Sequence, residues 1–273
     1  MRPNTLFPTL FLAISAAQAQ TAPPPKPLWE LGVVGLGISQ QAYPGSSARV
    51  NRALALPYLI YRGPFLRADT EGVGVRPVRT PTFEFDVSAQ ASLGSRASDD
   101  PARLGMPNIG TLVEAGPRLK WNLAGNDASG RLRAELALRG VFDLSDSLAY
   151  KGTVLQPSLQ WRRGWGDGWT STVAGSLLFA DQRLARTFYE VAPAYATAAR
   201  PAYQARSGLM DTRLSLVVSK DIGRDWNVFG FARIDSVAGA ANRASPLVRQ
   251  ATGHTVGIGV AWTWKRSGEP AAP

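Results

Sequence analysis

Apolar and polar residues alternate along most of the chain, and the pattern is most complete over residues 131–143. The even positions from Leu132 to Phe142 are apolar or small, whereas most of the odd positions are charged. Successive side chains of a β-strand point to opposite faces, so this segment predicts a strand with one apolar and one ionic face. Its length suits a tilted strand that crosses a bilayer. Such a complete separation is typical of a transmembrane barrel, which has lipid on one side and a polar lumen on the other.

The same alternation recurs in other segments and predicts about twelve strands. They cover residues 29–39, 52–61, 65–69, 72–78, 83–93, 113–123, 131–143, 155–162, 170–180, 210–218, 226–237 and 256–264. Pro57, Gly63 and Pro64 interrupt the pattern in the second to fourth of these, so their boundaries are the least defined. An even number of strands is usual for single-chain bacterial barrels. The predicted fold is an all-β, antiparallel, up-and-down transmembrane β-barrel.

The lengths of the connections test this prediction independently. If the N-terminus is periplasmic, even-numbered connections should be short turns and odd-numbered ones long external loops. The short connections are expected at 62–64, 79–82, 125–130, 164–168 and 221–225, and the long ones at 40–51, 95–110, 181–207 and 238–251. Two odd-numbered connections are exceptions to this rule, because the 70–71 hairpin and the 144–150 connection are not long. All eight Trp residues lie at or near predicted periplasmic strand ends, as in the aromatic belt of a barrel.

The first residues have the pattern of a secretory signal peptide. Arg2 supplies the positive start, residues 6–17 the apolar region, and residues 17–19 a small-residue cleavage site. We therefore expect an exported protein in the outer membrane of a Gram-negative bacterium. The expected organisation is a cleavable signal peptide at 1–19, a Pro-rich periplasmic lead-in at 20–28, the barrel at 29–264 and a polar C-terminal tail at 265–273.

Composition and charge exclude several classes of function. The chain has no Cys, so disulfides, thiolate metal sites and cysteine catalysis are impossible. No run of eighteen apolar residues could form a transmembrane helix. The formal net charge is +10, but the bases are spread along strands and loops without a basic cluster or an aromatic RNA-binding motif, so no nucleic acid is expected as a partner. Attraction to anionic outer-membrane lipid and lipopolysaccharide is the expected consequence.

Few residues could carry catalysis or bind a metal. His254 is the only histidine and shares parity with Val256 and Ile258, so we expect it to face lipid near the external rim, away from any lumen serine. Asp99 and Asp100 in a long loop hint at calcium, but such a pair is more often a solvated turn. The sequence therefore predicts a non-enzymatic protein with no catalytic residue, no metal site and no cofactor.

Charged residues at lumen-facing positions are expected to form a ladder of ion pairs. Isolated buried charges are costly, so the acids and bases should pair across neighbouring strands and leave a narrow pore. The predicted ladder consists of Glu84, Asp86, Glu114, Arg118, Lys120, Arg131, Arg133, Glu135, Arg139, Asp211 and Arg213, and the lumen-facing acids and bases also include Asp235 and Arg233.

The loop at 181–207 is rich in aromatic residues and arginine, which are common at binding sites. Two interpretations remain open. The loop either binds an external partner or folds into the barrel mouth as a lid. The residues expected to act in either role are Phe188, Tyr189, Arg200 and Tyr203.

Short motifs over nearly all of the expected mature chain resemble those of one family. They are Tyr43-Pro44-Gly45-Ser46, Pro57-Tyr58 with Tyr61-Arg62-Gly63 and Phe65, residues 104–109, Phe188-Tyr189-Glu190-Val191, residues 200–203 and residues 245–248. Their order and spacing resemble the MipA/OmpV family of outer-membrane proteins (MltA-interacting protein), named for an interaction with a murein-cleaving lytic transglycosylase.

The resemblance implies a scaffold in cell-envelope maintenance that joins murein hydrolases to synthases. Its implied partners are a periplasmic lytic transglycosylase and a penicillin-binding protein. The alternative function is a narrow outer-membrane pore for small solutes. One departure from the usual pattern is that residues 265–273 follow Trp264, whereas barrels of this kind usually finish on an aromatic residue at the chain end.

Overall fold

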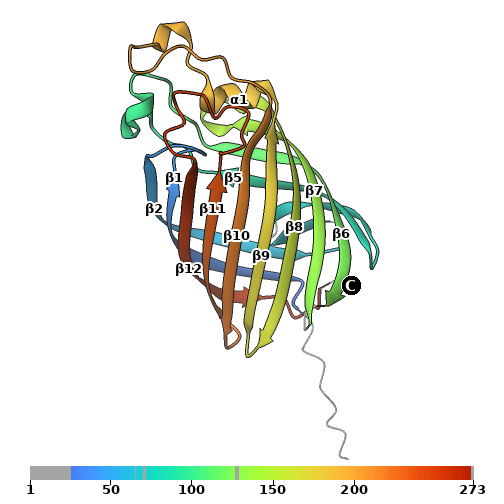
Figure 1. Cartoon of the computed structure of the whole chain (residues 1–273). Coiled ribbons are helices and arrows are strands. Elements are labelled where there is room, and N and C mark those ends of the chain that lie inside the picture. Colours follow the sequence, from blue (N-terminus) through green and yellow to red (C-terminus); the bar gives the residue numbers. More distant parts are fainter. Residues whose placement is uncertain (1–25, 65, 70–71, 127–128, 272–273) are drawn as a thin grey trace, which may run out of the picture.

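A computed structural model describes residues 26–64, 66–69, 72–126 and 129–271. Within these residues the chain forms a closed antiparallel barrel in which each strand pairs with its sequence neighbours and β12 pairs with β1 (Figure 1). The predicted up-and-down barrel is confirmed. The predicted signal peptide, most of the lead-in and the 70–71 hairpin lie outside the described residues.

The strands are β1 (Trp29–Gln41), β2 (Arg49–Arg62), β3 (Leu66–Asp69), β4 (Gly72–Arg79), β5 (Phe83–Ser92), β6 (Leu112–Asn126), β7 (Gly130–Asp143), β8 (Ala149–Gly166), β9 (Trp169–Ala180), β10 (Gly208–Ile222), β11 (Trp226–Ser236) and β12 (Thr252–Arg266). One α-helix, α1 (Gln182–Tyr189), lies in the 181–207 loop. Short 3-10 turns are η1 (Ala97–Asp99), η2 (Pro101–Arg103), η3 (Leu144–Asp146) and η4 (Pro193–Tyr195). Several strands extend beyond their predicted bounds, and β8 is the longest at 18 residues.

The strand register separates an apolar outer face from a charged inner face. In β7 and β8, Leu138 lies opposite Leu155 and both are exposed, at 48% and 38%. On the other face of the same strands Arg139 lies opposite Val154, and both are buried. Exposed aliphatic side chains on the outside are what a hydrocarbon solvent requires. Among the described residues, no helix is long and apolar enough to cross a bilayer.

Exposed tryptophans surround the end of the barrel that carries the short turns. Trp226 stacks on Trp262 with ring centroids 5.8 Å apart. The guanidinium of Arg163 lies 4.3 Å from the centre of the Trp165 ring. Amphipathic rings and snorkelling bases of this kind sit at a membrane interface. The tryptophan end is therefore the periplasmic end, and the long loops are external.

The lumen wall has an apolar stretch on β1 and β2, between Arg52 and the Glu30–Arg62 ion pair. On the inner face of β1 and β2, Leu36 pairs with Leu54 and Val34 pairs with Leu56. Further round the wall, a Cβ atom on Gly257 would lie 2.4 Å from the ring of Phe231, so this aromatic ring packs directly over glycine backbone. The lumen is therefore polar on one side and apolar on the other.

Candidate functional site

Ion pairs on β5 and β6 line the charged side of the lumen. Asp86 lies opposite Arg118 in the register and accepts two hydrogen bonds from it, at 2.9 Å from Nε and 2.8 Å from Nη2. Lys120 Nζ lies 3.0 Å from Glu84 and 3.1 Å from Asp86. The Lys120 side chain is only 3% exposed. Because this fork-like geometry neutralises each charge locally, the pairs can be buried in the wall.

The ladder of ion pairs continues on β6 to β8, where bases outnumber acids. Arg139 Nε lies 2.9 Å from Glu114 Oε2, and Arg139 also donates to Gln156. Glu135 is more loosely held, at 3.7 Å from Arg133 and 3.9 Å from Arg118. Closer to the periplasmic end, the register places Arg131 directly opposite Arg162. The predicted ladder residues therefore lie together, but the positive charges concentrate towards the periplasmic mouth.

A second ionic cluster lies on β10 and β11 below the external loops. Arg213 bridges two acids, at 3.1 Å from Asp211 and 2.7 Å from Asp235. Arg233 donates to the second oxygen of Asp235 at 2.9 Å. Asp211 is fully buried, and its Oδ1 has no hydrogen-bond partner among the described residues. This cluster lines the lumen wall of β10 and β11 beneath the external mouth.

The four long external loops fold together into one unit, which we call the external cap (residues 42–48, 95–110, 181–207 and 237–251; Figure 1). Its apolar core includes Tyr43, Tyr189 and Leu247 from three different loops. The same core contains lumen-facing Val141 and Val154, each 1% exposed. The cap therefore packs into the barrel mouth rather than standing free above it.

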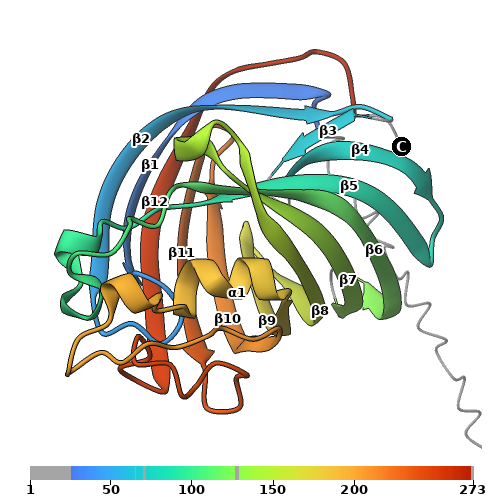
Figure 2. The same cartoon turned by 90° about the horizontal axis from the view of Figure 1, so that it is seen from above.

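Helix α1 is the part of the cap that contacts the barrel wall (Figure 2). The Asp181 carboxylate begins the helix by accepting from Leu184 N at 2.8 Å, and it also accepts from Thr153 N on β8 at 2.9 Å. A side chain that caps the first turn and binds a strand fixes both the start and the position of the helix. Leu184 and Phe188, one turn apart on its buried face, are 3% and 9% exposed.

Tyr189 is the most deeply placed aromatic residue of the cap. It is 1% exposed and its hydroxyl donates to the carbonyl oxygen of Pro44 at 3.1 Å. Burial, with a smaller contribution from the nearby Asp211 carboxylate, raises the pKa of this phenol well above its usual value. Phe188 and Tyr189 are both buried within the cap, so neither side chain is accessible to an external partner.

The other two loop residues also bind within the cap. Arg200 donates from Nη1 to the carbonyl oxygens of Ala102 and Leu104, both at 3.0 Å. The Tyr203 hydroxyl donates to Asn242 Oδ1 at 3.3 Å. Arg200 therefore ties the 181–207 loop to the 95–110 loop, and Tyr203 ties it to the last loop.

Asp100 plays a structural role in the cap, and a solvated turn was the wrong expectation for it. The residue is 1% exposed and accepts hydrogen bonds from Ser46 Oγ and Ala102 N, both at 2.9 Å. Arg103 lies 5.5 Å from the centre of the Tyr43 ring and donates to the Phe188 carbonyl at 3.2 Å. Burial lowers the pKa of this guanidinium from its usual value. Among the described residues, no group of three or more acidic or histidine side chains could hold a metal ion.

His254 lies at the external end of β12, on the exposed outer face. Its Nε2 lies 3.0 Å from Arg49 Nη1, and its carbonyl oxygen accepts from the same atom at 3.2 Å. The partner of the histidine is thus an arginine of β2, on the side of the wall that faces lipid.

Residues near the two ends of the described chain pair at the periplasmic end in a second structured region, which we call the periplasmic clasp (residues 26–30, 62 and 265–271). Leu28 N donates to the Glu269 carbonyl at 2.8 Å, and Ala271 N donates to the Lys26 carbonyl at 2.7 Å. Arg62 Nη1 donates to Glu30 Oε1 at 2.6 Å. The residues after Trp264 therefore extend β12 and then pair with the start of the described chain.

The comparisons with known proteins follow this geometry. The family model of the MltA-interacting protein MipA matches residues 33–264. No curated protein sequence matches the chain. Solved structures with a similar outline include the NanC porin (12% identity, 84% of this chain and 98% of that chain, TM-score 0.43). The KdgM porin has 9% identity, with 86% of this chain and 99% of that chain covered and a TM-score of 0.40. The COG4313 outer membrane channel from Pseudomonas putida F1 has 11% identity, with 90% of this chain and 98% of that chain covered and a TM-score of 0.40.

The lipid-facing barrel surface, the tryptophan belt and the family match agree with one another. The chain is an outer-membrane β-barrel, and the predicted family resemblance is confirmed over nearly the whole barrel. The protein belongs to the MipA (MltA-interacting protein) family.

Proposed function

We propose that the barrel is a non-enzymatic scaffold that holds a periplasmic murein-cleaving lytic transglycosylase, and with it a penicillin-binding protein, at the outer membrane. The family name supports the first partner. The observation that carries the proposal is the external cap, which packs into the mouth against Val141 and Val154. With the outer end occupied by its own loops, the periplasmic end is the end that remains available for a partner.

The charge of the periplasmic end indicates what kind of surface would dock there. Its described bases are Lys26, Arg62, Arg131, Arg162, Arg163, Lys220, Arg224, Lys265 and Arg266, and its described acids are Glu30, Asp167, Asp221, Asp225 and Glu269. Arg266 is engaged with Asp225 at 2.8 Å, whereas Lys265 and Arg224 are exposed. A basic face of this kind attracts a partner with an acidic surface and raises the rate of encounter.

The alternative of a narrow solute pore has less support in the geometry. Lys120, Arg139 and Asp211 line the lumen but are at most 5% exposed, which leaves little water around them. We expect planar-bilayer recordings to show low and unsteady conductance. Large, steady conductance from the intact protein would favour the pore instead.

The scaffold is tested by binding of the purified barrel in detergent to a purified lytic transglycosylase of the same cell envelope. Lys265→Glu and Arg224→Glu are expected to weaken binding several-fold each, and the loss should grow as salt is lowered. Arg206→Glu is the matched control, because it reverses one exposed base on the external cap. Equal binding by all three variants and the parent, or no binding by the parent, contradicts the proposal.

A further inference from the structure

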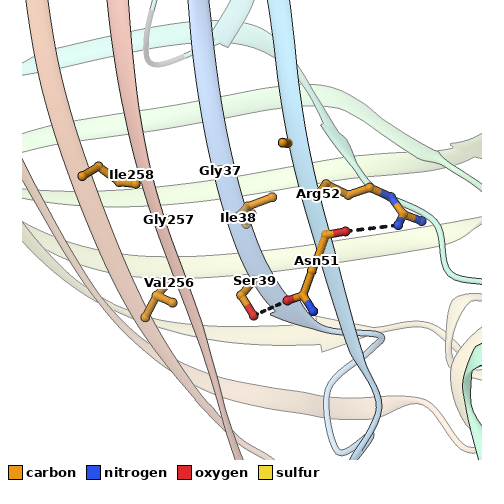
Figure 3. Close-up of a pocket in the computed structure, with 9 residues that line it drawn as sticks. Gly37, Ile38, Ser39, Asn51, Arg52, Val256, Gly257 and Ile258 are labelled. Atoms are coloured by element: carbon orange, nitrogen blue, oxygen red, sulfur yellow. Dashed lines mark hydrogen bonds between the residues drawn. The ribbon is translucent and has the colours of Figure 1, made fainter.

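A shallow groove of about 630 Å³ runs over the barrel wall where β12, β1 and β2 approach the external rim (Figure 3). Gly37 and Ala53, which are Cα partners, form its floor. Val256 and Ile258 form one side, and Ser39 and Asn51, in the lower part of Figure 3, close the end of the groove towards the external rim.

The groove faces the lipid rather than the lumen. Ile258 and Val256 are 67% and 45% exposed and belong to the outer face of β12. Gly37 lies opposite Ile258, and the next outward pair down the wall is Gly35 with Ala55, so the floor of small side chains continues towards the bilayer centre. A floor of small residues beside the taller Val256 and Ile258 leaves a groove in which an acyl chain gains dispersion contacts with the floor and with one wall.

A fixed positive charge lies at the end of this groove towards the external rim. Arg49 donates from Nε and Nη2 to Ser39 Oγ at 3.1 and 2.9 Å, and its Nη1 lies 3.0 Å from His254 Nε2. Ser39 Oγ in turn donates to Asn51 Oδ1 at 2.6 Å. Arg49 and His254 are both exposed, and within the described part of the chain no carboxylate forms an ion pair with Arg49. The guanidinium is therefore held in place by a hydroxyl, an imidazole and a carbonyl group rather than by a carboxylate.

We propose that this groove binds one lipopolysaccharide molecule, with a lipid A phosphate on Arg49 and His254 and an acyl chain along Gly37 and Ala53. A phosphate suits the arginine cation, and the hydroxyl, imidazole and carbonyl groups around Arg49 orient the guanidinium without an opposing charge. Position selects the lipid, because the groove reaches the external rim, where the outer leaflet presents lipopolysaccharide. The inner-leaflet end of the wall has its own bases, Arg163 and Lys220, stacked on tryptophans.

The test is native mass spectrometry of the purified barrel in mild detergent, titrated with lipopolysaccharide of defined lipid A structure. The parent is expected to retain one molecule, and Arg49→Gln to lower the affinity about tenfold, the effect of losing one charge-assisted contact. Gly37→Leu should lower it similarly by filling the floor. A Cβ atom at Gly37 would lie 4.0 Å from the nearest atom, and leucine is common on lipid-facing surfaces. The barrel should therefore fold with leucine at this position.

Two controls separate this site from general lipid adhesion. Arg163→Gln removes a lipid-facing arginine at the other end of the wall and is expected to leave lipopolysaccharide binding unchanged. Dephosphorylated lipid A and phosphatidylglycerol are expected to bind more weakly than the intact ligand. Parent-like affinity in both Arg49→Gln and Gly37→Leu overturns the proposal, as does equal binding of phosphatidylglycerol or a dimer that Gly37→Leu dissociates. The heat-modifiable gel shift of each variant verifies that it is folded.

Discussion

The hydroxyl of Tyr43 donates a hydrogen bond to the carbonyl oxygen of Leu247 at 2.9 Å, across 204 residues of sequence. It joins the first external loop to the last one. The Tyr43 ring also meets the ring of Tyr189 edge-on, with centroids 6.4 Å apart. Because both residues are buried, the external cap behaves as one small core built on top of the barrel.

Replacing Tyr43 with phenylalanine should loosen the cap and leave the barrel intact. The change removes one donor and leaves the Leu247 carbonyl without it, at a cost of about 1 kcal/mol or somewhat more. We expect limited proteolysis to cleave the external loops about five times faster, while the heat-modifiable gel shift stays the same. Tyr195→Phe, at a partly exposed position of the same cap, is the control. Unchanged cleavage of Tyr43→Phe would show that the cap does not depend on this bond.

The buried tyrosines should make the cap sensitive to alkali. Burial raises the pKa of both Tyr43 and Tyr189 above their usual value, so in the folded cap the phenols stay neutral. In the unfolded loops they ionise near pH 10. Their contribution to stability is therefore complete below about pH 10 and falls as the pH rises beyond it.

Ultraviolet difference titration of tyrosinate measures this directly. We expect the phenols of Tyr43 and Tyr189 to ionise only at the pH at which the external loops become susceptible to protease. In Tyr43→Phe, the ionisation of Tyr189 and the onset of cleavage should both shift, and by the same pH interval. Normal ionisation of all tyrosines near pH 10 with the loops still protected would contradict the burial of these two residues.

Breaking the most buried ion pair of the lumen should destabilise the barrel itself. Lys120→Met removes the cation that lies 3.0 Å from Glu84 and 3.1 Å from Asp86, whereas Asp86 keeps Arg118 as a partner. Removing one partner of a buried pair costs roughly 3–5 kcal/mol. Arg186→Met removes a base that is 52% exposed and pairs with Glu190 at 3.2 Å, and should cost at most about 1 kcal/mol. Urea unfolding in lipid vesicles, followed by tryptophan fluorescence, compares the two, and equal losses would show that the Lys120 cluster is not buried.

Alternation in the sequence was sufficient to predict the barrel where its two faces differ in chemistry. On β7 the outward leucines and inward charges leave only one register in which both faces are satisfied, and the structure has it. The pairing of Asp86 with Arg118 followed from the same parity. Oppositely charged residues that face the lumen at paired positions of neighbouring strands form ion pairs, because an isolated buried charge would be far less stable.

The pattern failed where both faces of a strand are apolar. On β2 the inward Leu54 and Leu56 and the outward Ala53 and Ala55 give no alternation to read, so the predicted bounds were too narrow. The ends of β8 were missed for a related reason, because Val154 faces the core of the cap rather than a polar lumen. Burial by another part of the chain cannot be seen in the local sequence.

The organisation of the cap also lay beyond the sequence. Helix α1 has eight residues, and it is stable because Leu184 and Phe188 pack on the barrel and Asp181 binds both its first turn and β8. Short helices of this kind depend on tertiary contacts more than on propensity. The contacts of Asp100 and Arg103 join loops that are far apart in sequence, and no spacing rule connects them.

The central claim is that the outer face of the barrel lies in hydrocarbon, and spin-label accessibility tests it most directly. Because the chain has no cysteine, Leu138→Cys, Leu216→Cys and Ser147→Cys each carry a single nitroxide in the protein reconstituted into vesicles. Labels at the outward positions 138 and 216 should collide more with oxygen than with a water-soluble nickel complex, and the label at position 147 on the external rim should do the reverse. A preference for the nickel complex at positions 138 and 216 would place that face in water and contradict the barrel in the membrane.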